Sequence, residues 1–329
     1  MTDSKSGSER GGMTAVLVAC CAVGLITVGA TLSLERGRLG PGLSSGASKD
    51  APLIATEEYG KRLLEQTTEV LGPDVPDPKM RYTTSRLNCG SCHLGTGTEP
   101  GTLTLLLVTE HYPRFSARSA TKTDIEDRIN ECMTRSLNGR ALSRNMPEMI
   151  AMASYLRSLG ARNAAMGAGQ KKAQEPAAFK TPDRAADLKA GKKVFGERCA
   201  ICHGTEGAGL LATSNPLHGY VFPPLWGPES FNDGAGMHRV LTASRFVKAR
   251  MPLGKPDLSD DQAFDVAAFI NSQPRPEMTG LEADYPDKTT KPSDNGYGPF
   301  ADSFSLEQHR FGPFPPIDAY YKSLKKNSK

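Results

Sequence analysis

The alternation of apolar and polar positions divides the chain into an apolar N-terminal run, two helical halves and a tail. Residues 13–34 carry no charged side chain, a length that fits either a signal peptide or a membrane anchor. Residues 35–55 are rich in Gly, Ser and Pro, which is typical of a tether. We therefore assign residues 1–34 to a signal or anchor segment and expect the folded part to begin at residue 56.

The first half shows the period of amphipathic helices at three places. Helices are predicted over residues 57–71, 125–137 and 147–159. Ile125, Ile129 and Cys132 share one face of the second of these helices. The third helix fits a start at Pro147 and an end before Gly160.

The second half repeats this order after a linker at residues 164–184, which has no apolar period. A helix is predicted over residues 185–199, followed by a long Gly- and Pro-rich loop. Ser259-x-x-Gln262 is a capping box for a final helix. Pro, Asp and Gly are frequent after that helix, so we expect no long helix there but an extended tail packed on the domains. The predicted domains cover residues 56–163 and 185–275, and the tail covers residues 276–329.

Each half contains one C-x-x-C-H sequence, which is the attachment motif of a c-type haem. The two motifs are Cys89-Gly90-Ser91-Cys92-His93 and Cys199-Ala200-Ile201-Cys202-His203. In this motif the cysteine sulfurs bind the porphyrin edge and the histidine takes one axial position on the iron. A zinc site is disfavoured because paired C-x-x-C knuckles usually lie closer together and need no trailing histidine. We therefore predict two covalently bound haem c groups and an all-α fold of two cytochrome c-like domains in tandem.

Composition adds three constraints. The formal net charge of +4 is too small to indicate nucleic-acid binding. Because haem c is attached outside the cytoplasm, we expect a periplasmic protein, exported by its N-terminal segment and, if that segment is retained, anchored to the inner membrane. Of the seven cysteines, four belong to the haem motifs and two, Cys20 and Cys21, lie in the apolar run. Cys132 is therefore left without an obvious disulfide partner.

The second axial ligand of each iron sets its reduction potential. In the second domain Met251-Pro252 follows a loop and precedes the last helix, so we predict Met251 as the ligand and interpret Met237 as a packing residue. In the first domain two candidates remain. Cys132 is one of them, and Met146, which also precedes a proline, is the other.

Basic side chains gather in the sequence around Cys132. Arg128 and Arg135 lie at i−4 and i+3 on its helical face, and Arg114 and Arg118 precede them. Positive charge lowers the pKa of a thiol and favours the thiolate that binds metal. Arginine also binds oxyanions through two parallel hydrogen bonds. The sequence therefore predicts an anion pocket beside the first haem.

The chain resembles the dihaem thiosulfate dehydrogenases over roughly residues 55–317. In the first domain the resemblance rests on His111-Tyr112-Pro113-Arg114-Phe115-x-x-Arg118 and on the stretch from Ile125 through Cys132 to Gly139. In the second domain and the tail it rests on Pro224-Leu225-Trp226-Gly227-Pro228, Ser230-Phe231-Asn232-x-Gly234-Ala235-Gly236-Met237, Phe246-Val247-Lys248, Met251-Pro252, Tyr297-Gly298-Pro299-Phe300-Ala301-Asp302 and Gln308-His309-Arg310-Phe311-Gly312-Pro313-Phe314.

The resemblance implies an enzyme that joins two thiosulfates into tetrathionate and releases two electrons; some members also act as tetrathionate reductases. It implies that the first haem, ligated by His93 and Cys132, is the catalytic one. Arg118, Arg128 and Ser136 match the substrate-binding residues of the family. The second haem then passes electrons to an acceptor cytochrome c or another carrier.

One position departs from the family pattern. Some members have a lysine just before the second-domain methionine, and that lysine can ligate the second haem. Here the residue is Arg250, which keeps its proton and has no free lone pair. We therefore expect His203 and Met251 to ligate the second haem in both redox states.

In the mechanism that we expect, Arg118 and Arg128 offset the repulsion of two dianions, and Ser136 donates a hydrogen bond to a sulfonate oxygen. Cys132 would hold one sulfur fragment covalently. The alternative is a non-catalytic dihaem electron carrier, the haem subunit of a larger dehydrogenase, which predicts Met146 on the first haem. A third reading, a dihaem peroxidase, would need an open or histidine-ligated haem.

Overall fold

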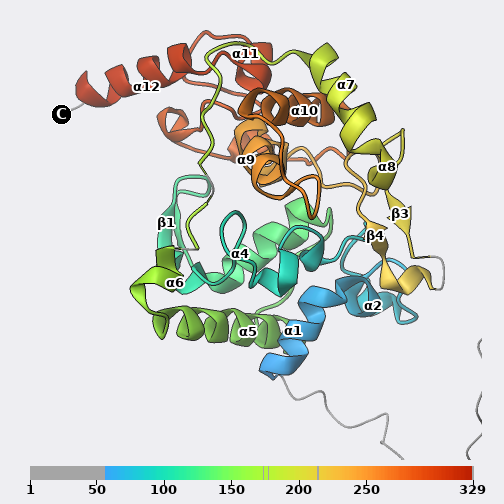
Figure 1. The fold of residues 1–329 in the computed structure, drawn as a ribbon. Helices are drawn as coiled ribbons and strands as arrows, with labels where there is room; N and C mark the ends of the chain where they lie inside the picture. The colour runs from blue at the N-terminus through green and yellow to red at the C-terminus, as the bar shows by residue number, and fades with distance from the viewer. Residues whose placement is uncertain (1–55, 173, 177, 213–214, 328–329) are drawn as a thin grey trace, which may run out of the picture. The chain divides into compact units, whose positions relative to one another are not determined.

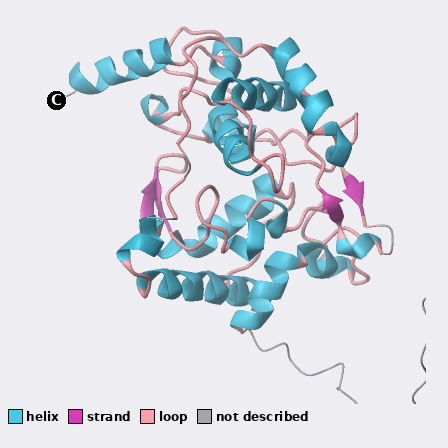
Figure 2. Cartoon of the chain, in the orientation of Figure 1, coloured by secondary structure: helices cyan, strands magenta, loops and turns pink. Residues whose placement is uncertain are grey.

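The computed structural model describes residues 56–172, 174–176, 178–212 and 215–327. The predicted signal or anchor segment and the predicted tether both lie outside this part of the chain. None of the helices in the described part is long and apolar enough to span a membrane. The described residues form two mostly helical domains in tandem, with two short β-ribbons and a helical tail (Figure 1, Figure 2).

In the first domain the helices are α1 (Glu57–Glu65), α2 (Thr67–Leu71), α3 (Val108–His111), α4 (Ile125–Glu131) and α5 (Pro147–Ala164). Strands β1 (Arg114–Ser116) and β2 (Thr121–Thr123) form an antiparallel ribbon before α4. The helix predicted over residues 57–71 is broken at Gln66, whose backbone leaves the helical region at φ −128°. The helix predicted over residues 125–137 is α-helical only to Glu131 and continues as a π-helical turn over Cys132–Ser136.

In the second domain the elements are α7 (Leu188–Arg198), α8 (Ala200–His203), β3 (Leu210–Leu211), β4 (Tyr220–Phe222), α9 (Val240–Arg250) and α10 (Asp260–Ser272). The predicted capping box is confirmed, because the Ser259 side chain accepts from the Gln262 backbone N–H at the start of α10. The prediction of a continuous loop before α10 was wrong, since α9 lies within it. Val240, Ser244 and Val247 are buried at helical spacing on α9 and carry the signal that was missed.

Each domain brings its first and last long helices together at a glycine. In the first domain α1 packs against α5, and a Cβ atom on Gly60 would lie 2.0 Å from the backbone oxygen of Ala151. In the second domain α7 packs against α10, and a Cβ atom on Gly191 would lie 2.1 Å from the backbone oxygen of Asp265. Only glycine permits such close approach, so the two domains share one packing solution.

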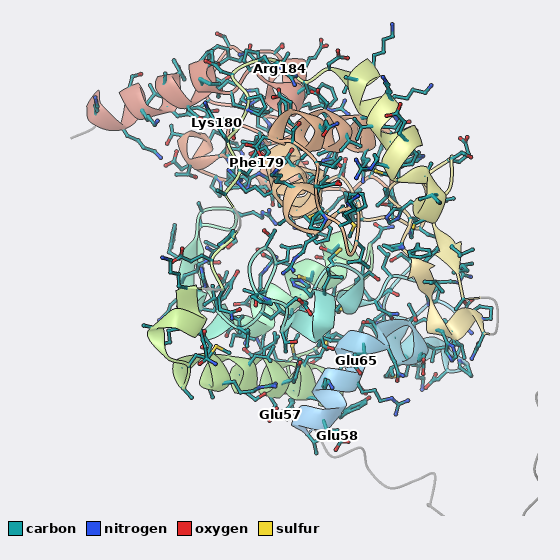
Figure 3. The ribbon with its side chains drawn as sticks, viewed as in Figure 1. Glu57, Glu58, Glu65, Phe179, Lys180 and Arg184 are labelled. Atoms are coloured by element: carbon teal, nitrogen blue, oxygen red, sulfur yellow. The ribbon has the colours of Figure 1, made fainter. Side chains whose placement is uncertain are left out.

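The linker is more ordered than its composition predicts. It begins with the short helix α6 (Ala168–Lys172) and then runs along the second domain. Figure 3 labels Phe179, Lys180 and Arg184 on this segment. Phe179 packs against both apolar clusters of the second domain, and the Arg184 guanidinium bonds the carboxylate of Asp265 at 2.8 Å.

The tail is not extended throughout. It contains two helices, α11 (Leu306–Phe311) and α12 (Pro315–Asn327), which corrects the prediction that no long helix follows α10. Two prolines open α12, where a missing N–H costs nothing. Ile317 and Tyr321 then follow at i and i+4, and both are buried with Phe314 in a cluster that includes Phe264 of α10. The end of the tail is therefore part of the second domain's core.

Candidate active site

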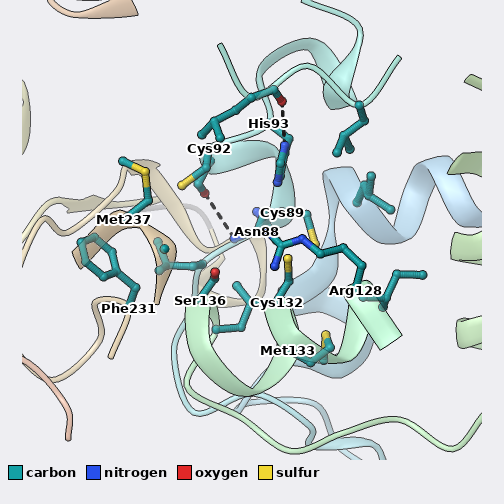
Figure 4. Close-up of a pocket in the computed structure, with 18 of the residues that line it drawn as sticks. Asn88, Cys89, Cys92, His93, Arg128, Cys132, Met133, Ser136, Phe231 and Met237 are labelled. Atoms are coloured by element: carbon teal, nitrogen blue, oxygen red, sulfur yellow. Dashed lines mark hydrogen bonds between the residues drawn. The ribbon is translucent and has the colours of Figure 1, made fainter. Parts of the chain in front are cut away.

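The first C-x-x-C-H motif lies in the wall of a largely apolar cavity (Figure 4). Cys89, Cys92 and His93 line it on one side. The remaining first-domain lining is mostly aliphatic and includes Leu64, Leu87, Leu103, Leu105, Val108, Ile129, Met133, Leu137, Met152 and Leu156. The second domain closes the cavity with Phe231, Gly236, Met237 and Thr242.

The His93 ring is oriented by a backbone carbonyl. Its Nδ1 atom lies 2.8 Å from the carbonyl oxygen of Leu103. Leu103 adopts the left-handed backbone region at φ 63°, a conformation that is costly for leucine and typical of functional sites. A hydrogen bond at Nδ1 leaves Nε2 as the unprotonated ring nitrogen, which is the arrangement of an iron-ligating histidine.

Cys132 faces the same cavity from the start of the π turn. The Leu137 N–H donates to the Cys132 carbonyl at 3.0 Å, a bond that spans five residues instead of four. Such turns within helices often mark functional positions. Arg128, Cys132 and Ser136 all line the cavity, and Figure 4 shows His93 above Cys132 and Ser136, with the Arg128 side chain reaching toward Cys132.

Met146 is not among the residues that line this cavity. It lies at the N-cap position of α5 and packs against the aliphatic core of the first domain. Of the two candidates for the second axial position, the structure therefore brings Cys132 to the cavity. The assignment of Cys132 as the iron ligand remains a prediction.

The charge around Cys132 favours its thiolate. Burial alone would raise the pKa of the Cys132 thiol, but the positive charge of Arg128 and contact with His93 outweigh burial and lower it. In return, the negative charge of Cys132 raises the pKa of Arg128 despite burial. Arg128 also donates to the Glu131 carboxylate at 2.9 Å, which holds its side chain in place.

Arg118 lies outside the cavity lining and is supported by the tail. Its carbonyl accepts from the Tyr285 N–H at 2.7 Å, and its Nε lies 3.9 Å from the carboxylate of Asp284. Tyr285 has a left-handed backbone at φ 54°, which stores strain beside this arginine. The Tyr297 hydroxyl donates at 2.6 Å to Oδ2 of Asp284, the same carboxylate oxygen that lies near Arg118.

Three of the four arginines expected to converge on Cys132, namely Arg118, Arg135 and Arg114, do not line its cavity. Arg135 is 9% exposed and turns away, donating to Asp284 at 2.8 Å and to the Gly234 carbonyl at 3.1 Å. Arg114 is exposed on β1, with its guanidinium carbon 5.1 Å from the Tyr112 ring centroid. The prediction of a four-arginine pocket was therefore wrong, and Arg128 is the predicted arginine that reaches the cavity.

The second motif shows the same histidine geometry. The His203 Nδ1 atom lies 2.8 Å from the Pro223 carbonyl oxygen, which repeats the arrangement at His93. Cys199 and Met251 pack against one apolar cluster of the second domain. Arg250, next to Met251, instead bonds the Pro100 carbonyl of the first domain and lies 3.8 Å from Glu99.

These residues fit haem c. Two thiols and an oriented imidazole occur in each domain, and in the first domain a second donor, Cys132, lines an apolar cavity together with them. No pattern in the sequence indicates that Thr242 closes this cavity, or that Asp284 and Tyr285 support Arg118. The only signal for Phe231 and Met237 was the motif that resembles the family.

Comparisons with known proteins agree with this geometry. Residues 80–165 match the family model "SoxA/TsdA, cytochrome c domain", and residues 186–270 match "Cytochrome C oxidase, cbb3-type, subunit III". The thiosulfate dehydrogenase of Allochromatium vinosum is 39% identical over 208 residues, which cover 62% of this chain and 75% of that protein. The thiosulfate dehydrogenase of Stutzerimonas stutzeri is 36% identical over 232 residues, which cover 70% of this chain and 71% of that protein.

A solved structure shows the same arrangement of domains. The "as isolated" form of the thiosulfate dehydrogenase (TsdBA) from Marichromatium purpuratum superposes with a TM-score of 0.60 at 29% identity. The match covers 84% of this chain and 54% of that longer chain. The chain therefore belongs to the thiosulfate dehydrogenase (TsdA) family and combines a SoxA/TsdA cytochrome c domain with a second cytochrome c domain.

Proposed function

We propose that the protein oxidises two thiosulfate ions to one tetrathionate ion in the periplasm and passes the two electrons released to an external carrier. The observation that carries this proposal is the cavity in which Cys132 faces His93 while Arg128 and Ser136 line the same wall. The identity of the substrate is inferred from the thiosulfate dehydrogenases to which the chain is similar. The periplasmic location rests on the attachment of haem c outside the cytoplasm.

The chain's own residues bind the substrate and offset its charge. Two thiosulfate dianions repel each other, and the Arg128 guanidinium lowers that repulsion in a cavity with mostly apolar walls. Ser136 lines the cavity, and its hydroxyl forms no hydrogen bond with another described residue. It is therefore available to donate to a sulfonate oxygen. Cys132 places opposite His93 a sulfur whose pKa is lowered by Arg128, which favours its thiolate form. When bound, the haem groups supply one-electron acceptors.

Electrons leave the first site through the second haem in this proposal. His203 and Met251 are its proposed axial ligands. Arg250, the residue before Met251, cannot ligate iron, so it cannot replace Met251 on the second haem. Methionine ligation keeps the potential of the second haem relatively high, which favours electron flow toward it. The external carrier is an acceptor cytochrome c or a protein of similar potential.

Electron paramagnetic resonance of the oxidised protein tests the proposal. We expect a low-spin ferric signal of the thiolate type that is lost in Cys132→Met and retained in the matched control Met146→Leu. Turnover of thiosulfate should be abolished in Cys132→Gly, while both haems stay attached, because the motif cysteines are unchanged.

The non-catalytic electron carrier makes the opposite prediction. It requires two signals of the His/Met type, and Cys132→Met should leave both unchanged. Met146→Leu should remove one of them. The enzyme is supported over this alternative by Met146, which is partly buried against the core of the first domain and is not among the residues that line the cavity.

A further inference from the structure

Two arginines of the tail region lie close together without a carboxylate partner. The Arg275 Nη2 atom donates to the Ile270 carbonyl at 2.8 Å, and its guanidinium carbon lies 4.3 Å from the Phe231 ring centroid. Its Nε and Nη1 atoms are buried and have no hydrogen-bond partner in the described part of the chain. Among the described residues, no ion pair joins Arg275 or Arg310 to an acidic side chain.

Arg310 donates to the Asn271 carbonyl at 3.2 Å, and a further buried donor without a partner belongs to Asn295. Asn295 is 1% exposed, and its Nδ2 atom has no hydrogen-bond partner among the described residues. A Cβ atom on the following residue, Gly296, would lie 3.3 Å from the His238 ring and 3.8 Å from Cγ of Arg310. His238 in turn feels the charge of Arg275. These contacts place Arg275, Arg310, Asn295 and His238 in one cluster, which we call the donor cluster.

The donor cluster is short of negative charge. Burial and the charge of Arg310 lower the pKa of Arg275 to about 10, and burial together with Arg275 lowers the pKa of His238 to about 4. Asp233 is the acidic side chain that acts on Arg275, but it forms no ion pair with it, and its Oδ1 accepts from the Met278 N–H. Buried cations and donors without acceptors destabilise a fold unless an anion compensates them.

The surroundings of the donor cluster indicate which anion it takes. Phe231, on which Arg275 lies, and Met237, which precedes His238, both line the cavity of the first haem motif. Both also lie in the segment between His203 and Met251, the proposed ligands of the second haem. A haem bound through thioethers retains two free propionate carboxylates, and arginine binds a carboxylate through two parallel hydrogen bonds.

We propose that Arg275 and Arg310, together with Asn295, bind a propionate carboxylate of one of the two haems. This inference rests on the attachment of haem c to the two motifs and is independent of the reaction at Cys132. The arginines hold the propionate ionised, and the propionate supplies the acceptors that the buried donors lack. A free oxyanion such as sulfate shares the same chemistry, and the experiment separates the two sources.

Spectroelectrochemical titration of the purified dihaem protein tests the proposal, with Arg275→Gln as the variant. We expect the midpoint potential of one haem to fall, because loss of a nearby positive charge stabilises the ferric state. We also expect that potential to rise as pH falls through the carboxylate range, since the propionate pKa is no longer held low. Because Arg275 also acts on His238 and Asp233, the same comparison is made in the His238→Gln background, which removes the imidazole titration from the pH dependence.

Three comparisons make the result decisive. Arg275→Lys keeps the charge and should restore most of the potential, and Arg157→Gln, at an exposed arginine of α5, should leave it unchanged. If Arg275→Gln fails to fold, Arg310→Gln carries the same expectation with a smaller shift. Potentials and pH dependence equal to those of the unmodified protein would overturn the proposal. So would unchanged potentials together with weaker binding of added sulfate, which would identify a free-anion site.

Discussion

Arg128, Cys132 and Ser136 are four residues apart, and the π turn after α4 allows all three to line one cavity. A π turn contains more residues than an α turn, so a side chain at i+4 returns to the starting face while one at i+3 falls short of it. Ser136 therefore stays with Cys132, and Arg135 turns to Asp284. This is the physical reason why the predicted arrangement of arginines on an ideal helix was wrong.

Arg128→Gln tests the role of charge at the cavity. The substitution removes the cation that lowers the Cys132 pKa and that, in the proposed function, offsets substrate charge. A charge-assisted hydrogen bond contributes about 1.5–3 kcal/mol, so we expect kcat/KM for thiosulfate to fall roughly 10- to 100-fold. Steady-state kinetics measure the effect. Arg157→Gln on the surface of α5 is the control, and an equal loss in both variants would contradict a specific role for Arg128.

At the residue scale, the residues that could be predicted from the sequence are those in a recognisable motif or with an unusual set of neighbours. The haem motifs need no structure to be recognised, and Cys132 was identified by its lack of a disulfide partner and its basic neighbours. The tail contacts of Arg118 could not be predicted, because Asp284 and Tyr285 are more than 160 residues away in the chain and only folding brings them near.

The glycine crossings of α1 with α5 and of α7 with α10 are the main packing feature at the scale of elements. At both crossings a backbone oxygen of the partner helix occupies the place of a side chain. The helices can therefore approach more closely than larger residues would allow. The crossing fixes the position of the first helix in each domain, and the haem motif follows that helix in the chain.

Helix α7 provides its own matched pair of variants. Gly191→Ala places a methyl group against the Asp265 carbonyl and should lower the free energy of unfolding by about 1–3 kcal/mol. Gly196→Ala meets no atom within 4 Å and should be neutral or stabilise by roughly 0.5–1 kcal/mol, because alanine favours the helix. Thermal unfolding of both variants measures the difference. A similar Tm for the two would show that the crossing tolerates a side chain.

Helices were predictable where they carry a cap or a wide apolar stripe, as α10 and α5 do. Helix α9 was missed because it emerges from a segment rich in Gly and Pro, and its own sequence mixes β-branched and polar residues. Helix α12 was missed because its few apolar residues are buried by the core of the second domain, and this tertiary packing overrides the weak local signal.

At the scale of the whole described molecule, the tail joins the two domains. Its end is buried in the core of the second domain through Phe314 and Ile317. Asp284, earlier in the tail, bonds Arg135 and lies beside Arg118 of the first domain. Further links come from Arg250, which bonds the Pro100 carbonyl, and Arg86, which pairs with Glu229. The cavity is thus closed by contacts between segments far apart in the sequence.

Asp284→Asn tests this link. Loss of a buried charge that compensates two arginines should lower the free energy of unfolding by on the order of 3 kcal/mol. It should also reduce kcat/KM for thiosulfate, because Arg118 loses its partner. Denaturant unfolding and steady-state kinetics measure the two effects. Asp318→Asn, at an exposed position of α12, should change neither, and unchanged kinetics in Asp284→Asn would separate the tail from catalysis.

The position of Asp284 late in the chain affects the order in which the protein matures during synthesis. Both haem-attachment motifs, Cys132 and Arg128 are translated before residue 204, well ahead of the segment that supports Arg118 and Arg135. Both haem-attachment motifs therefore leave the ribosome before the segment that completes the surroundings of Arg118 and Arg135.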